Sequence, residues 1–238
     1  MPIISSTQQV VDTSSGILAV PALCFLPLDD SGASVYARNR ATPSTTGTYS
    51  STNISFKQNV LSSFEQDGID LTGGSVSLPS SGFVNMNGNF GVLFSYRMNT
   101  SGVNALDRVL MDITDGTNHL KVLIPANTKT IKAMYNATSV TGASDAAVTD
   151  KGCSVMVRLD GTNLTLYKNG FQDAQVAYTP TSWTPTSGIF SALAKLTTIA
   201  TFGTLTDALV NTIFGNGTIS ADSVAPQKSR RNPIWPEK

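Results

Sequence analysis

Charge is scarce in this sequence. Charged residues make up 13% of its 238 residues, and 16 Lys and Arg balance 16 Asp and Glu. A nucleic-acid-binding surface needs clustered Lys and Arg, so the composition argues against a nucleic-acid partner. Glutamate is nearly absent, with Glu65 and Glu237 the only two. Because Glu is a strong helix former, its scarcity favours a protein built from β-sheets.

Cysteine and long apolar runs are scarce as well. Cys24 and Cys153 are the only cysteines, and two give no disulfide framework. They could pair if their Cα atoms lie within about 7 Å, but two buried thiols acting as small hydrophobic side chains are the favoured interpretation. Residues 1–21 lack the basic start and continuous apolar centre of a signal peptide. No stretch is apolar for long enough to span a membrane, so we expect no membrane partner.

The sequence offers little for catalysis. His119 is the single histidine, and we interpret it as a satisfied or exposed strand residue. No Gly-x-Ser-x-Gly nucleophile motif, Walker-type phosphate loop or cysteine–histidine zinc cluster occurs. The closest carboxylate pairs are Asp67 with Asp70 and Asp112 with Asp115. Both stand beside turn residues, where Asp is favoured for hydrogen bonds to the backbone. We therefore predict a protein that is not an enzyme and that has no cofactor.

What the sequence does contain is a strong β signal from Cys153 to Tyr178. Apolar and polar residues alternate along 153–160 and again along 164–167, which is the period of a half-buried strand. Asn169-Gly170 then supplies the two positive-φ positions of a tight antiparallel turn. Three strands in direct succession cannot be parallel, because parallel neighbours need a long crossover. The sequence thus predicts an antiparallel β protein.

Further strands and one helix are predicted on both sides of this meander. Residues 187–201 fit either a helix or two strands, and we favour strands. Residues 207–214 are the best helix, with Thr206 as its N-cap, Leu205 packing on Val210, and Gly215 at its end. The remaining strands are expected at 75–78, 90–97, 108–113, 120–124 and 131–135.

The meander also carries a family resemblance. The pattern from Val155 to Gly170, Val-x-Val-x-Leu-Asp-Gly-x-x-Leu-x-Leu-Tyr-x-Asn-Gly, resembles the central hairpin of laminin-G-like, concanavalin A-like domains. Residues 64–68 with 76–79, residues 90–97 and residues 205–209 resemble other segments of such domains, in the same order. The resemblance spans about residues 25–220 and implies an all-β, antiparallel two-sheet jelly-roll sandwich with one short helix near the C-terminus.

Two polar extensions flank the region of resemblance. We divide the chain into an extended N-terminal arm (1–22), a jelly-roll sandwich (23–220) and an extended C-terminal tail (221–238). The tail combines basic residues with Ile and Trp between prolines, and Trp needs something to bury it. Folding back onto its own domain and binding a neighbouring chain are both open for this segment. The candidate partner-binding residues are Arg230, Arg231, Ile234 and Trp235.

Carbohydrate recognition needs an exposed aromatic face beside amide or carboxylate groups. Tyr49, Tyr135 and Trp183 adjoin polar loops, and Asn136 follows Tyr135. These four residues are the candidate glycan-binding residues. The alternative is that aromatic residues at strand ends cover the edge of the core.

Domains of the resembled family often hold calcium at the rim of the sandwich. Asp29, Asp30, Asp115 and Asn118 could provide loop oxygens for it. No spacing singles these residues out, so calcium is only a weak expectation.

Two functional hypotheses follow. Bacteriophage virions commonly use concanavalin A-like modules, so the resemblance implies a structural component of a virus particle. We expect a capsid decoration or head-surface protein that is assembled in the host cytoplasm and docks through its terminal arms on virion proteins or on copies of itself. The alternative is a glycan-binding, lectin-like module, such as a tail or fibre receptor-binding domain that binds host-surface glycans.

Overall fold

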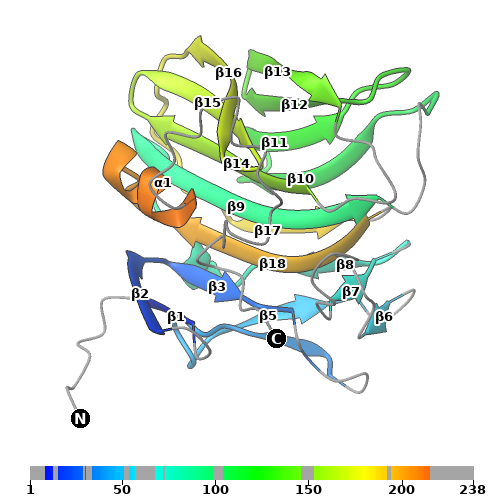
Figure 1. Ribbon diagram of the computed structural model, residues 1–238, viewed down its shortest axis with the longest axis vertical. Coiled ribbons are helices and arrows are strands. Elements are labelled where there is room, and N and C mark those ends of the chain that lie inside the picture. The colour runs from blue at the N-terminus through cyan, green and yellow to red at the C-terminus, as the bar shows by residue number, and fades with distance from the viewer. Residues whose placement is uncertain are drawn as a thin grey trace.

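The computed structural model describes residues 9–12, 16–28, 30, 34–50, 54–56, 68–71, 73–98, 104–145, 153–191 and 194–214. Two antiparallel sheets pack face to face, and one helix lies outside them (Figure 1). The prediction of an all-β, two-sheet sandwich with a short helix near the C-terminus is confirmed. Among the described residues, no helix combines the length and apolar character that crossing a membrane requires.

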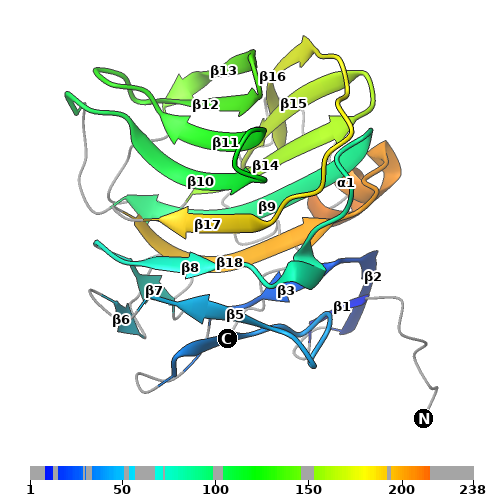
Figure 2. The same cartoon turned by 180° about the vertical axis from the view of Figure 1, so that it is seen from behind.

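The first sheet has the order β13-β12-β11-β10-β17-β8-β5-β4 (Figure 2). Most of its strands were expected from alternation. Strand β17 shows that the first part of the ambiguous segment 187–201 is a strand, as favoured from the sequence. The bounds in sheet order are Thr138–Asp145, Thr130–Tyr135, His119–Ile124, Arg108–Thr114, Ser187–Ser191, Ser75–Ser77, Thr46–Tyr49 and Tyr36–Arg38.

The second sheet has the order β16-β15-β14-β9-β18-β7-β6, with β3 also paired to β18. The predicted meander β14-β15-β16 forms one end of it, and β18 confirms a second strand in the ambiguous segment. The bounds in the same order, with β3 last, are Phe171–Ala177, Asn163–Lys168, Cys153–Asp160, Asn89–Met98, Ala194–Phe202, Ile69–Asp70, Ser55–Phe56 and Cys24–Leu26.

Part of the predicted N-terminal arm is regular structure. Strands β1 (Gln9–Asp12) and β2 (Gly16–Pro21) pair antiparallel as a separate two-stranded sheet, and β2 contacts the helix α1 (Asp207–Phe214). The predicted tail, 221–238, lies outside the described residues. The division into arm, sandwich and tail stays a prediction.

The tight turn of the meander has the predicted geometry. Asn169 (φ 50°) and Gly170 (φ 91°) both have positive φ, as a two-residue turn between antiparallel strands requires. Asp160 closes the preceding turn, where its Oδ1 accepts hydrogen bonds from the N–H groups of Thr162 (2.9 Å) and Asn163 (2.6 Å). Local sequence chemistry therefore sets the register of β14, β15 and β16.

The main core lies between the two sheets. Strand β9 shows the alternation, because Phe90, Val92, Phe94 and Tyr96 point into this core. The ring of Phe94 meets that of Phe190 from the opposite sheet edge-to-face, with ring centroids 5.3 Å apart. Such pairs add to the free energy gained from apolar burial.

Both cysteines are buried as free thiols in this core. Burial raises the pKa of Cys24 to about 12 and that of Cys153 to about 11. The interpretation of the two cysteines as buried hydrophobic side chains is confirmed.

A second apolar cluster lies on the outer face of the second sheet, beneath α1. Leu93, Met156 and Phe202 of the sheet pack with Leu205, Val210 and other residues of the cluster. The helix begins as predicted, with Thr206 Oγ1 accepting a hydrogen bond from Leu209 N–H (3.3 Å). Gly215, the expected end of the helix, lies outside the described residues. The covered outer face explains why β9 is buried on both sides.

Strand β4 forms one edge of the first sheet, and side chains occupy its outward backbone groups. Ser34 Oγ donates to Tyr36 O (2.6 Å) and lies 3.3 Å from Tyr36 N. Asp30 Oδ2 accepts from Arg38 N–H (3.4 Å), while Oδ1 accepts from Arg38 Nε (2.9 Å). Three backbone groups on this edge are thus satisfied by neighbouring side chains.

Candidate functional site

Two of the predicted glycan-binding aromatics come together, but inside the protein. Tyr135 and Trp183 are only 1% and 5% exposed. Tyr135 stacks edge-to-face on Tyr178, with ring centroids 4.9 Å apart, and lies 6.2 Å from the Trp183 ring. A sugar cannot stack on buried rings, so the condition of an exposed aromatic face is not met. We name Tyr135, Tyr178 and Trp183 the aromatic cluster.

Hydrogen bonds explain why the aromatic cluster turns inward. The Tyr135 hydroxyl lies 3.1 Å from Met86 O and 2.9 Å from Thr181 O, to which it can donate, and it accepts from Trp183 Nε1 at 3.0 Å. Tyr178 donates to the Gly88 carbonyl oxygen at 2.8 Å. The polar ends of these rings are therefore satisfied within the fold, and the rings cover the edge of the core, which is the alternative weighed above.

The other two predicted glycan-binding residues lie elsewhere. Tyr49 is buried, its hydroxyl donates to Asp30 Oδ2 (2.7 Å), and its ring meets Phe56 edge-to-face at 5.2 Å. Asn136 occupies the positive-φ position (52°) between β12 and β13, and its Oδ1 accepts from His119 N–H (2.9 Å). The four residues do not form one exposed surface.

Of the residues considered for calcium, Asp30 and Asp115 have their carboxylate oxygens engaged within the protein. Asp30 bonds Tyr49 and Arg38, as described above, and Asp29 lies outside the described residues. Asp115 Oδ1 accepts from the N–H groups of Thr117 (2.9 Å) and Asn118 (2.7 Å). These hydrogen bonds hold the pKa of Asp115 below its usual range, and those from Asn118 have the largest effect. Within the described part of the chain, no group of three or more His, Cys, Asp or Glu side chains could hold a metal ion.

His119 belongs to a charged group on the first sheet. Its Nδ1 lies 2.9 Å from Asp112 Oδ1, and Lys121 Nζ lies 3.1 Å from Asp112 Oδ2. Asp112 thus pairs with two neighbours on the adjacent strand. The interpretation of His119 as a satisfied strand residue agrees with this arrangement.

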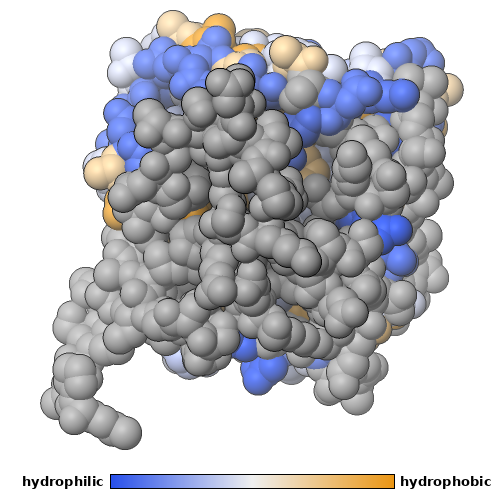
Figure 3. All heavy atoms as spheres, viewed as in Figure 1, coloured by the Kyte–Doolittle hydropathy of each residue, from blue (hydrophilic) through white to orange (hydrophobic). Residues whose placement is uncertain are grey.

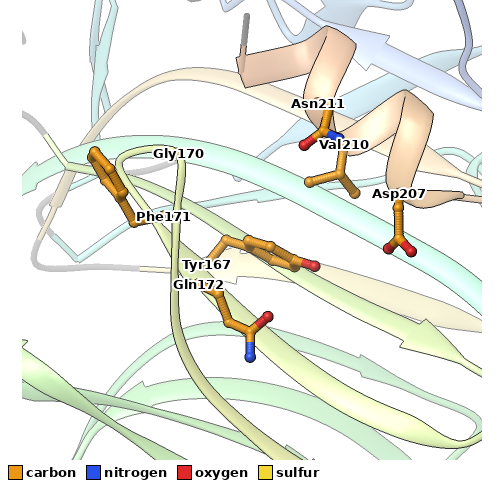
Figure 4. Close-up of a pocket in the computed structure, with 7 residues that line it drawn as sticks. All are labelled: Tyr167, Gly170, Phe171, Gln172, Asp207, Val210 and Asn211. Atoms are coloured by element: carbon orange, nitrogen blue, oxygen red, sulfur yellow. The ribbon is translucent and has the colours of Figure 1, made fainter. Parts of the chain in front are cut away.

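The structure does contain an open cleft, between the β15–β16 hairpin and α1 (Figure 4). Its volume is about 350 Å³. Tyr167 lies between the end of the hairpin and the helix, with Val210 and Asp207 pointing toward it from α1 (Figure 4). We call this the hairpin–helix cleft, and its lining residues are Tyr167, Gly170, Phe171, Gln172, Asp207, Val210 and Asn211.

The rim of the cleft carries polar groups, and the ring of Phe171 lies beside the end of the hairpin, pointing away from the helix (Figure 4). Phe171 is 45% exposed at the start of β16, and the amides of Gln172 and Asn211 are exposed on the hairpin and on the helix. The Asp207 side chain is 84% exposed. In the space-filling view, hydrophilic residues gather over the strands at the top of the molecule, with a few hydrophobic ones among them (Figure 3).

The floor of the cleft is held together by one buried cation. Arg158 on β14 is 9% exposed, and its Nη1 donates to Asp207 Oδ1 on α1. Burial lowers the pKa of Arg158, but its hydrogen bonds to Asp207 and Tyr167 raise it above the ordinary value. Arg158 therefore stays protonated and ties the helix to the sheet.

A glycine allows the helix to approach the sheet. A Cβ at Gly91 on β9 would lie 2.6 Å from Leu205 Cδ2 and 3.3 Å from Leu205 Cβ. Leu205, directly before the helix, can therefore pack flat on the strand. This contact sets the height of α1 above the hairpin.

The sequence reasoning did not identify the lining residues of the cleft as a site. One signal was available for Phe171. In β16 the inward positions are Ala174 and Val176, which pack against the core. Phe171 directly follows the Asn169-Gly170 turn at the end of the hairpin, which favours an exposed ring. For the helix residues, nothing in the sequence indicated which part of the sheet they would face.

Comparisons with known proteins relate the fold to solved structures. No protein-family model and no curated protein match the sequence. A structure of botulinum neurotoxin type C matches with a TM-score of 0.59 and 12% identity, over 79% of this chain and 50% of that chain. The binding domain of Paraclostridial Mosquitocidal Protein 1 matches with a TM-score of 0.60 and 11% identity, over 79% and 50%. Trypanosoma rangeli sialidase in complex with the inhibitor DANA matches with a TM-score of 0.58 and 12% identity, over 87% and 35%.

These likenesses concern the fold. The chain spans about half the length of the toxin chains and about a third of the sialidase chain. At 11–12% identity they place the chain among β-sandwich domains of the kind found in toxin binding domains and in sialidase.

Proposed function

We propose that this protein is a carbohydrate-binding module and that the hairpin–helix cleft is its binding site. The observation that carries the proposal is an open cleft in which an apolar floor of Tyr167 and Val210 lies beside two amides and a carboxylate, with the exposed Phe171 ring at the end of the hairpin. Binding sites for small ligands are concave and combine apolar surface with a few converging polar groups.

Each part of the cleft has a role in this proposal. The Phe171 ring at the end of the hairpin offers a large and rigid apolar surface on which the C–H face of a sugar unit outside the cleft can stack. Gln172 and Asn211 each carry an amide that donates and accepts hydrogen bonds, which matches sugar hydroxyls. Asp207 adds acceptor oxygens for hydroxyl donors. Tyr167 and Val210 form the apolar floor.

The neighbours in fold support a glycan-binding function. Cell entry of botulinum neurotoxin type C depends upon interaction with two ganglioside molecules. The binding domain of botulinum neurotoxin DC, with a TM-score of 0.55, is in complex with SialylT. These are properties of those proteins, and the present chain corresponds to about half of each.

The virion role predicted from the sequence resemblance has no such support. Its candidate contacts, Arg230, Arg231, Ile234 and Trp235, lie outside the described residues. It stays a prediction, as does the absence of enzymatic activity. A glycan-binding module is compatible with placement on a particle surface, because adhesion needs only the exposed cleft.

A glycan array with purified full-length protein tests the proposal. We expect the wild type to bind a set of glycans and Phe171→Ala to bind them at least about tenfold more weakly, because truncating an exposed aromatic contact at a binding site is costly. Ile189→Ala is the matched control, since Ile189 is an exposed apolar residue (39%) on the first sheet. Binding of no glycan by the wild type, or equal binding by Phe171→Ala and the wild type, would contradict the proposal.

A further inference from the structure

The exposed charge of the hairpin–helix cleft is negative. Among its lining residues, Asp207 is the one that carries a charge at neutral pH, and its side chain is 84% exposed. The nearest cation shown to contact it, Arg158, is largely buried and already donates to Asp207. A ligand in the cleft therefore meets a carboxylate at the surface and a guanidinium only beneath it.

The adjacent lysine does not balance this carboxylate. Lys168 follows Tyr167 on β15, but its Nζ donates to the backbone oxygen of Asp145 on β13. Its ammonium group is thus directed to the neighbouring sheet. No Lys or Arg belongs to the cleft lining.

We infer that the cleft selects neutral sugars and discriminates against glycans that end in an acidic sugar. This inference rests on the proposed function. The carboxylate of an acidic sugar, placed within reach of the amides of Gln172 and Asn211, would lie close to Asp207, and the described residues that line the cleft include no exposed cation to compensate. Like charges about 4 Å apart repel by an amount that corresponds to about a fivefold loss of affinity in bulk water and to a larger loss near a protein surface, so a loss of about tenfold is a modest expectation.

The hydrogen-bonding groups of the cleft also fit a neutral ligand. Two amides that donate and accept, together with a carboxylate that only accepts, suit hydroxyl groups, which do both. A volume of about 350 Å³ lies near the lower end of ligand pockets, about 300–1,000 Å³. The expected ligand is therefore the neutral end of a glycan chain rather than a long polysaccharide.

Matched pairs of glycans test the inference. Lactose and 3′-sialyllactose, and further pairs on the array that differ only in a terminal acidic group, are compared with full-length wild-type protein. We expect the neutral member of each bound pair to bind about tenfold more tightly. The preference should shrink as salt is raised from about 50 mM to 500 mM, since salt screens charge repulsion at an exposed site.

Charge variants assign the preference to one carboxylate. Asp207→Asn keeps the shape of the side chain and removes its charge, and we expect the ratio of neutral to acidic binding to fall toward one, whatever change in the affinity for neutral glycans accompanies the loss of an acceptor oxygen. Asp107→Asn is the control, because it removes one negative charge at an exposed position outside the cleft. It should leave the preference unchanged.

The outcomes separate the inference from the proposed function. Equal or tighter binding of the acidic members by the wild type, with binding still lost in Phe171→Ala, overturns the inference and leaves the proposed function standing. An equal loss of preference in Asp107→Asn and Asp207→Asn also overturns it. Binding of no glycan at all overturns both.

Discussion

The aromatic cluster and the hairpin–helix cleft are built from similar residues and differ in what covers them. Both place an aromatic residue next to polar residues in the sequence. Around Tyr135, the backbone carbonyls of Met86 and Thr181 lie within hydrogen-bond distance of the hydroxyl, and the ring is shielded from solvent. Around Phe171, the turn and the helix leave the ring half exposed. Proximity to polar loop residues is therefore a poor indicator of an exposed aromatic face.

The largest difference between the two regions is expected in stability. Trp183→Ala should lower the free energy of unfolding by about 3–5 kcal/mol, because it leaves a cavity in the core and removes the Nε1 donor to Tyr135. Phe171→Ala should change it by no more than about 0.5 kcal/mol, as is usual for surface positions. Urea unfolding at pH 7 measures both.

Similar losses in these two variants would break the comparison. A large loss in Phe171→Ala would show that the Phe171 ring supports the fold, and glycan binding at the cleft would then have to be judged from Asp207→Asn instead. A small loss in Trp183→Ala would show that the aromatic cluster is not part of the core.

A smaller effect isolates the polar part of the aromatic cluster. Tyr135→Phe keeps the ring and removes the hydroxyl, which leaves the buried Trp183 Nε1 without the acceptor it has now. We expect a loss of about 1–3 kcal/mol in the free energy of unfolding. Tyr36→Phe is the control, because Tyr36 is an exposed tyrosine and should lose almost nothing. Equal losses would show that the inward hydrogen bonds do not hold the cluster.

The smallest effect is expected at the Asp160 turn, which borders the aromatic cluster. Burial acts to raise the pKa of Asp160, but hydrogen bonds from Asn163 and Thr162 hold it below its ordinary value. A carboxyl whose pKa is lowered by folding stabilises the protein above its unfolded pKa of about 3.9, and this contribution is lost as the pH falls through the folded pKa. Asp160→Asn should therefore reduce the loss of stability between pH 7 and pH 3.

The measurement is urea unfolding at both pH values, with Asp107→Asn beside it. Asn at position 160 retains an oxygen that can accept the turn hydrogen bonds. The wild type and Asp160→Asn should therefore differ mainly in how their stability depends on pH. An unchanged dependence of stability on pH would show that the pKa of Asp160 does not differ between the folded and unfolded states.

Local patterns were enough to predict most of the strands. Alternation and the Asn169-Gly170 turn gave β14, β15 and β16, and Thr206 with Asp207 gave the start of α1. These features depend on residues within a few positions of each other. They need no knowledge of which strands lie side by side.

The candidate site could not be predicted in this way. Phe171 and Asn211 are 40 residues apart in the sequence and come together only because β18 pairs with β9, which in turn pairs with β14. The fit of Leu205 over Gly91 then places the helix. Burial of Tyr135 and Trp183 likewise depends on the segment around Met86, whose N–H donates to Trp183 O at 2.7 Å. Such long-range contacts leave no periodic signal.

The side chains along β4 have a consequence for how these molecules meet one another. An open sheet edge offers a row of free N–H and C=O groups, on which a strand from another molecule can template and begin a fibril. Here Ser34 occupies both polar groups of Tyr36, and Asp30 takes the N–H of Arg38. A second copy would have to displace these bonds before it could add a strand. In a concentrated solution of the protein, the β4 edge of the first sheet is therefore protected against this route to aggregation.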